Sequence, residues 1–115
     1  MPWRIRVKKK FQAAHYLTNY KGGNEPLHGH TWEVEVFLRA DKLDAAGVGV
    51  DFVDIDQYLE EILPNYTCLN DIYPFSPSAE NVARYLYRKI KEKFPQLEKV
   101  VVWETENCGA EYWEE

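Results

Sequence analysis

The sequence predicts an α+β fold of element order ββααββ, in which two helices cover one face of a four-stranded antiparallel sheet. Three observations support this prediction. Two segments near the amino terminus alternate apolar and polar residues, two later segments place apolar residues three or four positions apart, and β-branched residues gather near the carboxyl terminus. The length of 115 residues is typical of one domain, so we expect a single domain over residues 1–115.

Two long strands are expected first, over residues 3–15 and 28–39. In each, one phase of side chains is apolar and the other is polar or charged, as in a half-buried strand. Lys9 interrupts the apolar phase of the first strand, and residues 18–26 between the strands are predicted to form a loop because they are rich in Asn, Gly and Pro. The residues of the two apolar phases are Trp3, Ile5, Val7, Phe11, Ala13 and His15, and His28, His30, Trp32, Val34, Val36 and Leu38.

Two amphipathic helices follow. The first is expected to begin after the N-cap residue Asp51 and to end before Pro64. The second is expected to begin at residues 76–78 and to stop at Pro95, while residues 65–75 are too rich in Asn, Asp and Pro to be helical and are predicted to be a loop. The apolar stripes of the two helices are Phe52, Ile55, Leu59 and Ile62, and Val82, Leu86, Ile90 and Phe94.

Two short strands complete the predicted sheet, over residues 100–105 and 110–113, with a turn at residues 107–109 between them. Because two helices can cover one face of such a sheet, the other face meets water or another subunit. The apolar content of the sheet favours a subunit. We therefore expect a homo-oligomer whose sheets join edge to edge, which also covers the exposed strand edges.

The composition excludes several classes of function. The formal net charge of -5 provides no field that would hold the chain on nucleic acid or on an anionic membrane. No apolar run approaches the roughly 20 residues that span a bilayer, and the first twelve residues lack the apolar core of a signal peptide. We therefore expect a cytoplasmic protein with no nucleic-acid or membrane partner. Cys68 and Cys108 are expected to be free thiols in that reducing compartment.

The distribution of the three histidines suggests a metal site. His28 and His30 are two positions apart in an expected strand, so their imidazoles project from the same face, and Gly29 leaves room for close approach. His15 ends the preceding strand, and the loop can bring it beside this pair. Three neutral imidazoles leave a tetrahedral zinc ion with an open fourth position, as in catalytic zinc sites. On spacing alone, the alternative is three unrelated histidines.

Five segments of the chain occur in the order and at the spacing of a known family. They are Phe11-Gln12-Ala13-Ala14-His15, Leu27-His28-Gly29-His30-Thr31, Asp51-Phe52, Pro77-Ser78-Ala79-Glu80-Asn81 and Glu104-Thr105. Together they resemble the 6-pyruvoyl-tetrahydropterin synthase and 6-carboxytetrahydropterin synthase family, and the resemblance covers nearly the whole chain. The combination of F-x-A-A-H with H-G-H is its most specific part. The family has the T-fold, whose ββααββ order agrees with the order predicted above.

The resemblance implies roles for six residues. The three histidines become the ligands of a Zn²⁺ ion, and Glu104 grips the pterin ring, because a carboxylate can accept bonds from a ring N–H and an exocyclic amino group together. Thr105 and Ser78 lie in the matching motifs and are expected to bind the substrate. The implied partner is a small-molecule pterin, and the implied assembly is a homohexamer. Without the resemblance, Glu104 would be interpreted as a solvated carboxylate at a strand end.

The sequence departs from the family pattern at the catalytic base. Members that eliminate triphosphate or form the carboxylated product place a Cys four residues before the first His of H-G-H, where this chain has Asn24. The next residue, Glu25, resembles the branch in which Glu replaces the Cys and the product is 6-hydroxymethyl-7,8-dihydropterin, a folate precursor. Glu25 is therefore the candidate catalytic residue. The alternative is an ordinary loop carboxylate.

A second departure concerns proton transfer. The family usually has an Asp-His pair just before a Leu-Asn step, and alignment on Leu69-Asn70 places Asn65 and Tyr66 at the positions of that pair. The chain has no fourth histidine. Tyr66 can donate a proton in its place, or Cys68 can reach the site, whereas a loop tyrosine is more often simply packed.

These observations predict a zinc-dependent lyase that acts on 7,8-dihydroneopterin triphosphate. Glu25 would take the proton of the C2′ hydroxyl, so that the C1′–C2′ bond breaks and a hydroxymethyl group remains on the ring. One alternative is a 6-pyruvoyl-tetrahydropterin or 6-carboxy-5,6,7,8-tetrahydropterin synthase in which another residue replaces the Cys. Another is a zinc-dependent pterin-binding protein without turnover. The pathway, among tetrahydrobiopterin, folate and queuosine biosynthesis, stays open.

Overall fold

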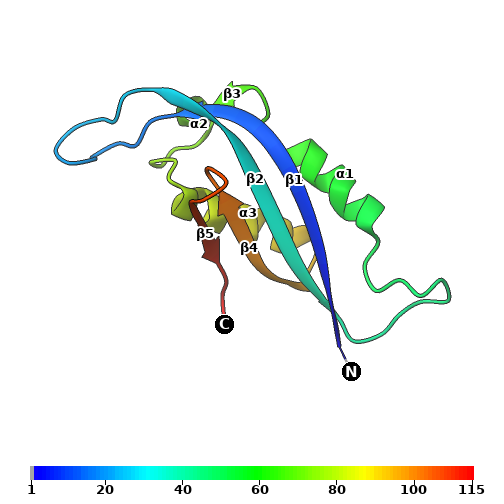
Figure 1. The fold of residues 1–115 in the computed structure, drawn as a ribbon. Coiled ribbons are helices and arrows are strands. Elements are labelled where there is room, and N and C mark those ends of the chain that lie inside the picture. Colours follow the sequence, from blue (N-terminus) through cyan, green and yellow to red (C-terminus); the bar gives the residue numbers. More distant parts are fainter. Residues whose placement is uncertain (1) are drawn as a thin grey trace.

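The computed structural model describes residues 2–115, which form one twisted sheet with helices on one side (Figure 1). The strands are β1 (Trp3–His15), β2 (His28–Ala40), β3 (Thr67–Cys68), β4 (Leu97–Trp103) and β5 (Gly109–Tyr112), and the helices are α1 (Phe52–Ile62), α2 (Leu69–Ile72) and α3 (Ala79–Lys93). The sheet order is β3-β1-β2-β4-β5. None of the helices in this part of the chain is long and apolar enough to cross a membrane.

The first two strands form a long antiparallel hairpin, as predicted. Their register runs from Trp3 opposite Ala40 to His15 opposite His28. The alternation of the sequence is visible in the burial, because Phe11, Ala13 and His15 of β1 are all buried. The hairpin therefore carries its apolar phase into the core and ends with two histidines side by side.

The prediction of a four-stranded antiparallel sheet was wrong in one detail, because a fifth strand is present. Strand β3 pairs parallel to β1, with Thr67 beside Ala13 and Cys68 beside Ala14. Just before β3, the backbone N–H of Tyr66 donates to the carbonyl of Gln12 in β1, at 2.6 Å. Two residues are too few to show a period in the sequence. The same segment, predicted to be a loop, also contains the single-turn helix α2.

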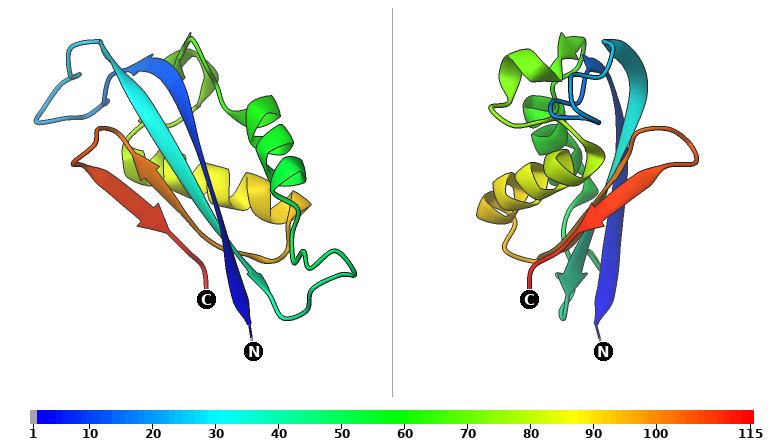
Figure 2. Two further views of the ribbon diagram at one scale, coloured as in Figure 1. Left: turned by 45° about the vertical axis from the view of Figure 1, so that its right-hand side comes forward. Right: turned by 90° about the vertical axis from the view of Figure 1, so that its left-hand side faces the viewer.

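Helices α1 and α3 pack on the same face of the sheet, as predicted (Figure 2). Helix α1 is capped by Asp51, whose side chain accepts from Val53 N, and α3 is capped by Ser78, whose hydroxyl accepts from Asn81 N. The core between helices and sheet consists of fully buried apolar side chains. They include Phe11, Trp32, Val34, Val36, Leu38, Ile55, Leu59, Val82, Leu86, Ile90, Val100 and Val102.

The last two strands are shifted by a few residues from the predicted ranges. Strand β4 ends at Trp103, because the following residues form a turn in which the Thr105 hydroxyl accepts from the backbone N–H groups of Asn107 and Cys108. Gly109 then begins β5. A Cβ atom at this position would lie 2.6 Å from the ring of Trp103, so the close approach of the two strands requires glycine.

The sheet face without helices is partly covered by its own side chains. Glu35 is buried on this face, where one carboxylate oxygen accepts from the indole of Trp103 at 2.9 Å and the other lies 3.5 Å from Arg6. The cationic groups of Arg6 and Lys99 lie over the ring of Phe37. This face is therefore a mixture of charged and aromatic groups.

Candidate metal centre and active site

The three histidines form one cluster at the end of the β1–β2 hairpin. His15 is the last residue of β1, and His28 and His30 are the first and third residues of β2. The hairpin register puts His15 directly opposite His28, and the spacing of two returns His30 to the same face. The ring centroids lie between 4.7 and 5.2 Å apart. The structure thus brings the predicted residues together.

Two of these rings are oriented by backbone carbonyls. His15 Nδ1 lies 2.8 Å from the carbonyl oxygen of Pro77, and His28 Nδ1 lies 2.8 Å from that of Pro26. Because a carbonyl can only accept, each Nδ1 carries the proton and each Nε2 keeps its lone pair. The two Nε2 atoms face each other at 3.2 Å. Hydrogen bonds of this kind typically fix the tautomer of a metal-binding histidine.

The third nitrogen of the cluster has no hydrogen-bond partner. His30 Nε2 is buried, and Oε1 of Glu104 lies 3.0 Å away without forming a hydrogen bond of acceptable geometry within residues 2–115. Burial lowers the pKa of His30, the neighbouring rings of His15 and His28 lower it further, and Glu104 opposes this shift. The neutral imidazole that a metal ion requires is therefore favoured.

The residues present fit a metal ion. One ligand atom from each histidine and one carboxylate oxygen of Glu104 all lie within 4.8 Å of one another. A cation placed between these atoms would relieve the repulsion between the two facing lone pairs and would supply a partner for His30 Nε2. Three nitrogens with one oxygen are a donor set typical of transition-metal sites. The side chain of Trp32 packs edge-on against His15 and supports the cluster from the core side.

Glu25 lies at the rim of the cluster, outside the four-residue group. Its Oε1 is 3.9 Å from His28 Nδ1 and accepts a hydrogen bond from Leu17 N at 3.2 Å. Its own backbone N–H donates to the carbonyl of Leu17. These two hydrogen bonds connect Glu25 to Leu17 on the other side of the loop, so they hold the carboxylate beside the histidines.

The hydroxyl groups of Ser78 and Thr105, the two residues predicted to bind substrate, each accept hydrogen bonds from nearby backbone N–H groups. Ser78 caps α3 and directly follows Pro77, whose carbonyl orients His15. Thr105 closes the turn after β4 and lines a cavity of about 360 Å³ with Lys8 and Lys10, on the sheet face without helices. Neither side chain belongs to the metal-binding group.

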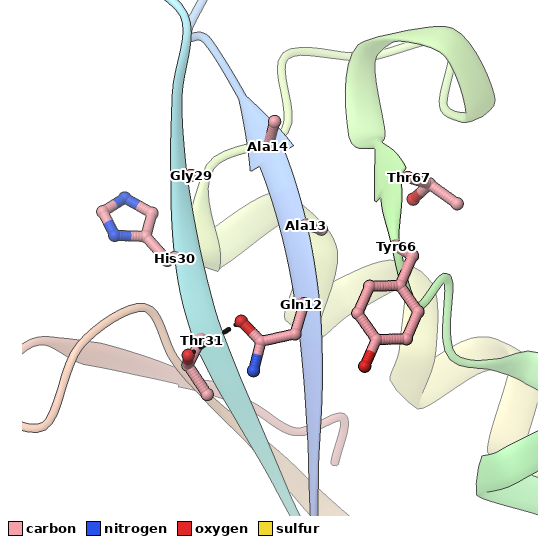
Figure 3. Close-up of a pocket in the computed structure, with 8 residues that line it drawn as sticks. All are labelled: Gln12, Ala13, Ala14, Gly29, His30, Thr31, Tyr66 and Thr67. Atoms are coloured by element: carbon pink, nitrogen blue, oxygen red, sulfur yellow. Dashed lines mark hydrogen bonds between the residues drawn. The ribbon is translucent and has the colours of Figure 1, made fainter.

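Tyr66 lies across the hairpin from the cluster. A cavity of about 410 Å³ is lined by Gln12, His30, Thr31 and Tyr66, among others, and in Figure 3 the rings of Tyr66 and His30 lie on either side of the β1–β2 pair. Tyr66 has a φ of 59° and is 83% exposed. Asn65 uses its side chain to accept from Gln12 N at 2.7 Å. In one chain, Tyr66 therefore does not extend into the site.

One supporting residue was missed by the sequence-based reasoning. The side chain of Asn70 accepts from Tyr16 N at 2.9 Å and donates to Tyr16 O at 2.8 Å, so it clamps the backbone directly after His15. The signal available was the Leu69-Asn70 step, which served for alignment with no role given to its side chain. The carbonyls of Pro26 and Pro77 could not be recognised, because any residue carries a carbonyl.

Comparison with known proteins identifies relatives of this chain. The family model described as 6-pyruvoyl tetrahydropterin synthase matches residues 4–115. The chain is similar to a 6-carboxy-5,6,7,8-tetrahydropterin synthase of Synechocystis, at 31% identity covering 96% of this chain and 93% of that protein. It is also similar to a protein of the same name from Aquifex aeolicus, at 28% identity over the full length of both.

Solved structures give the same fold. The 6-pyruvoyl tetrahydropterin synthase of Caenorhabditis elegans superposes with a TM-score of 0.84 at 21% identity, covering 100% of this chain and 97% of that one. A Plasmodium vivax 6-pyruvoyltetrahydropterin synthase superposes with a TM-score of 0.81 at 17% identity, covering 99% and 98%. With a family model over nearly the whole chain and a relative above 30% identity, the chain belongs to the 6-pyruvoyl tetrahydropterin synthase family of lyases.

Proposed function

We propose that this chain is a zinc-dependent lyase that acts on 7,8-dihydroneopterin triphosphate. The observation that carries the proposal is the histidine cluster, in which the Nε2 atoms of His15 and His28 face each other and Nε2 of His30 has no hydrogen-bond partner among residues 2–115. The carboxylate of Glu25 lies at the rim of this cluster. A pterin-specific lyase of this family needs both a cation site and a base beside it.

The donor set favours zinc among the common metals. Three imidazole nitrogens suit Zn²⁺, whereas Mg²⁺ and Ca²⁺ prefer sites made of oxygen ligands. A zinc ion in this place would act as a Lewis acid that lowers the pKa of a substrate hydroxyl. His15, His28 and His30 would hold the ion, with their Nε2 atoms already directed to one place.

Glu25 is the residue we assign to proton transfer. Its carboxylate accepts from Leu17 N–H and lies 3.9 Å from Nδ1 of His28, beside the ring whose Nε2 would hold the ion. Asn24, the residue at the position of the family's cysteine, has no group that can act as a base. The assignment therefore rests on Glu25 alone among the residues of this loop.

The names of the relatives favour one product. Curated relatives that cover nearly the whole chain are called 6-carboxy-5,6,7,8-tetrahydropterin synthase, so we propose 6-carboxy-5,6,7,8-tetrahydropterin as the product. Its formation takes up one water and releases triphosphate together with the two outer side-chain carbons as acetaldehyde, so that only C1′ remains on the ring as the carboxyl group. In this reaction Glu25 would remove a proton from a side-chain carbon or hydroxyl in place of the missing cysteine.

A second candidate product is favoured by Glu25 itself. If Glu25 takes the C2′ hydroxyl proton, the C2′ oxygen becomes an aldehyde, the C1′–C2′ bond breaks, and its electron pair moves into the ring imine. Protonation of C1′ then leaves 6-hydroxymethyl-7,8-dihydropterin, and a two-carbon aldehyde departs with the triphosphate. The Plasmodium vivax protein has been solved as variants in which a glutamate, described as a catalytic residue, is replaced by cysteine or alanine.

Product analysis tests the proposal and separates the two candidates. The zinc-loaded chain is incubated with 7,8-dihydroneopterin triphosphate, and the products are identified by mass spectrometry. The 6-carboxy product supports the elimination reaction, and the 6-hydroxymethyl product supports carbon–carbon cleavage. Unchanged substrate in the presence of zinc would refute the proposal and leave a pterin-binding protein.

We also assign pterin binding to the mouth of the cluster, with Glu104 as its main acceptor. The substrate contacts predicted for Ser78 and Thr105 stay predictions, because Ser78 caps α3 and Thr105 lines the cavity on the sheet face without helices. The change Glu104→Gln replaces one acceptor oxygen by a donor that faces the donors of the pterin. We expect a loss of about 1–3 kcal/mol in pterin affinity, measured by calorimetry on zinc-loaded protein. The exposed carboxylate of Glu106 gives the control variant, Glu106→Gln, which should bind pterin like the unchanged protein.

A further inference from the structure

The place of Glu104 is set by the turn that follows β4. Its backbone N–H donates to the carbonyl of Cys108 at 2.9 Å, and the Thr105 hydroxyl accepts from the N–H groups of Asn107 and Cys108. Val102 lies two residues before Glu104 and is fully buried on the face that the helices cover. The side chain of Glu104 lies on the same face, where its Oε1 is 3.0 Å from His30 Nε2. The turn therefore aims this carboxylate at the cluster.

The carboxylate lies at ligand spacing from the histidine nitrogens. Oε1 of Glu104 is 3.0 Å from His30 Nε2 and 3.8 Å from His15 Nε2, and the two nitrogens of His15 and His28 are 3.2 Å apart. In a tetrahedral zinc site with bonds of roughly 2.0–2.1 Å, neighbouring ligand atoms are about 3.3 Å apart. The three measured spacings bracket this value.

The cluster is closed at the core side and open at the side of Glu104. The side chain of His15 is 1% exposed, whereas those of His28 and Glu104 are 34% and 30% exposed. A small molecule therefore reaches the cluster from the side on which His28 and Glu104 are exposed. The carboxylate occupies the place that a fourth ligand would take.

We infer that Glu104 is the fourth ligand of the metal ion, closing the three-histidine site from its solvent side until substrate arrives. This inference rests on the proposed metal site and gives Glu104 a role there before any pterin is bound. A buried nitrogen 3.0 Å from a carboxylate oxygen, with no hydrogen bond between them, is expected when both atoms are ligands of one cation.

Two consequences distinguish this role from pterin binding alone. First, the affinity of the protein for zinc depends on Glu104 even without pterin. Second, Glu104 must move aside before the hydroxyls of a substrate reach the ion, so the carboxylate then stands beside the entering molecule as an acceptor. A residue that touches only pterin would affect neither zinc affinity nor the binding of a simple anion to the ion.

The first test measures zinc affinity in the absence of pterin, by competition with a chelator. Glu104→Gln keeps the size of the side chain but replaces the carboxylate by a weak neutral ligand, so zinc affinity should fall roughly tenfold or more. Glu106→Gln removes an exposed carboxylate two residues away and should leave zinc affinity unchanged. Circular dichroism and the melting temperature of the zinc-free proteins show whether each variant is folded.

The second test asks whether the fourth position is closed. Cobalt(II) is substituted for zinc, and azide is titrated while the visible absorption of the ion is followed. Azide should bind Glu104→Ala at a concentration at least about tenfold lower than the unchanged protein, because the alanine leaves the position open. Glu106→Ala should titrate like the unchanged protein.

The outcomes separate this inference from the proposed function. If Glu104→Gln binds zinc as tightly as the unchanged protein and Glu104→Ala binds azide no better, Glu104 is not a ligand and the inference is wrong. If His15→Ala and His30→Ala also keep their zinc, the metal site itself is wrong and the proposed function fails with it. Loss of zinc in the histidine variants alone would leave the proposed function standing without this inference.

Discussion

His15 and His28 face each other with their Nε2 atoms 3.2 Å apart, while the Nδ1 atom of each ring donates to the carbonyl of a proline. In neutral rings this arrangement directs two lone pairs at each other, which is unfavourable unless a cation lies between them. The relationship depends on the hairpin register, since a slip of one residue would turn one of the two rings to the other face.

Removal of a histidine should remove the metal. We expect His15→Ala and His30→Ala to lower bound zinc from about one ion per chain to a small fraction, because two remaining imidazoles are too few donors. Metal content after dialysis, measured by atomic emission, checks this. The control is Gln12→Ala in the same strand, whose side chain accepts a hydrogen bond from the Thr31 hydroxyl and does not belong to the metal-binding group. Full zinc occupancy in both histidine variants would contradict the assignment.

Asn70 should support the metal site from a distance. Asn70→Ala removes two hydrogen bonds to the backbone of Tyr16, so we expect a loss of about 1–3 kcal/mol in the free energy of unfolding. Because Tyr16 follows His15, zinc affinity should fall as well. Urea unfolding and chelator competition measure the two effects. Asn107→Ala, an exposed asparagine in the last turn, should change neither.

Lys9 should stabilise the docking of α1. Its Nζ lies 3.1 Å from Asp56 and 3.0 Å from Glu60, and these partners raise the pKa of Lys9. Both carboxylates are exposed and screened by solvent, so Lys9→Met should cost about 1 kcal/mol in the free energy of unfolding, and less at high salt. The exposed Lys42 gives the control, Lys42→Met.

The pH dependence of this ion pair has a definite sign. Because the pKa of Lys9 is raised in the folded protein, its contribution is fully present below the unfolded pKa of about 10.5 and is lost as pH rises through the folded pKa. The difference between the unchanged protein and Lys9→Met should therefore be constant near neutral pH and shrink above about pH 10.5. A difference that grew in this alkaline range would exclude the ion pair as its cause.

The sequence predicted those parts of the fold in which the apolar pattern repeats over a long element. Strands β1 and β2 run for 13 residues each, and α3 for 15, so the alternation and the helical stripe are repeated many times. Strand β3 has two residues and α2 has four, which leaves no period to detect. Their formation depends on tertiary contacts with β1, such as the bond from Tyr66 N to Gln12 O.

The features of the candidate site can likewise be separated into those that follow from local spacing and those that depend on contacts between distant segments. The pairing of His28 with His30 follows from local spacing, and the alternation of β4 correctly placed Glu104 on the face of Val100 and Val102. The contact between Glu104 and His30 could not be read locally, because it depends on the pairing of β4 with β2, which are far apart in the sequence. The roles of Ser78 in capping and of Thr105 in the turn are local, yet only the structure shows both.

The sheet edges lead to a prediction about assembly. Strand β1 has partners on its outer side at Ala13 and Ala14 within residues 2–115, and β5 forms the other edge of the sheet. Unpaired edges of this length invite pairing with another copy. The edges favour self-association, and the resemblance to the family implies six copies. We therefore propose a homohexamer, and light scattering at micromolar concentration should give a mass near six times the 13.6 kDa of one chain. A monomer at this concentration would contradict the proposal.

Glu25 decides how the proposed reaction proceeds, and its hydrogen bond to Leu17 N makes a sharp test possible. Glu25→Gln keeps an oxygen that can accept from Leu17 N, so the loop and the zinc site should keep their places, while the side chain can no longer take a proton. We expect zinc content and pterin affinity to stay nearly the same and turnover to fall about a hundredfold or more. Glu25→Ala removes the acceptor as well, so it should also loosen the loop and lower the melting temperature.

A restored thiol tests the chemistry from the other side. In the double variant Asn24→Cys, Glu25→Ala, a thiol stands where the family's cysteine would be, and a thiolate near a bound cation is favoured because the positive charge lowers its pKa. We expect this variant to regain part of the turnover, with its product shifted towards triphosphate elimination, measured by mass spectrometry. If Glu25→Gln keeps the turnover of the unchanged protein, Glu25 is not the base. Tyr66 and Cys68 then become the residues to test.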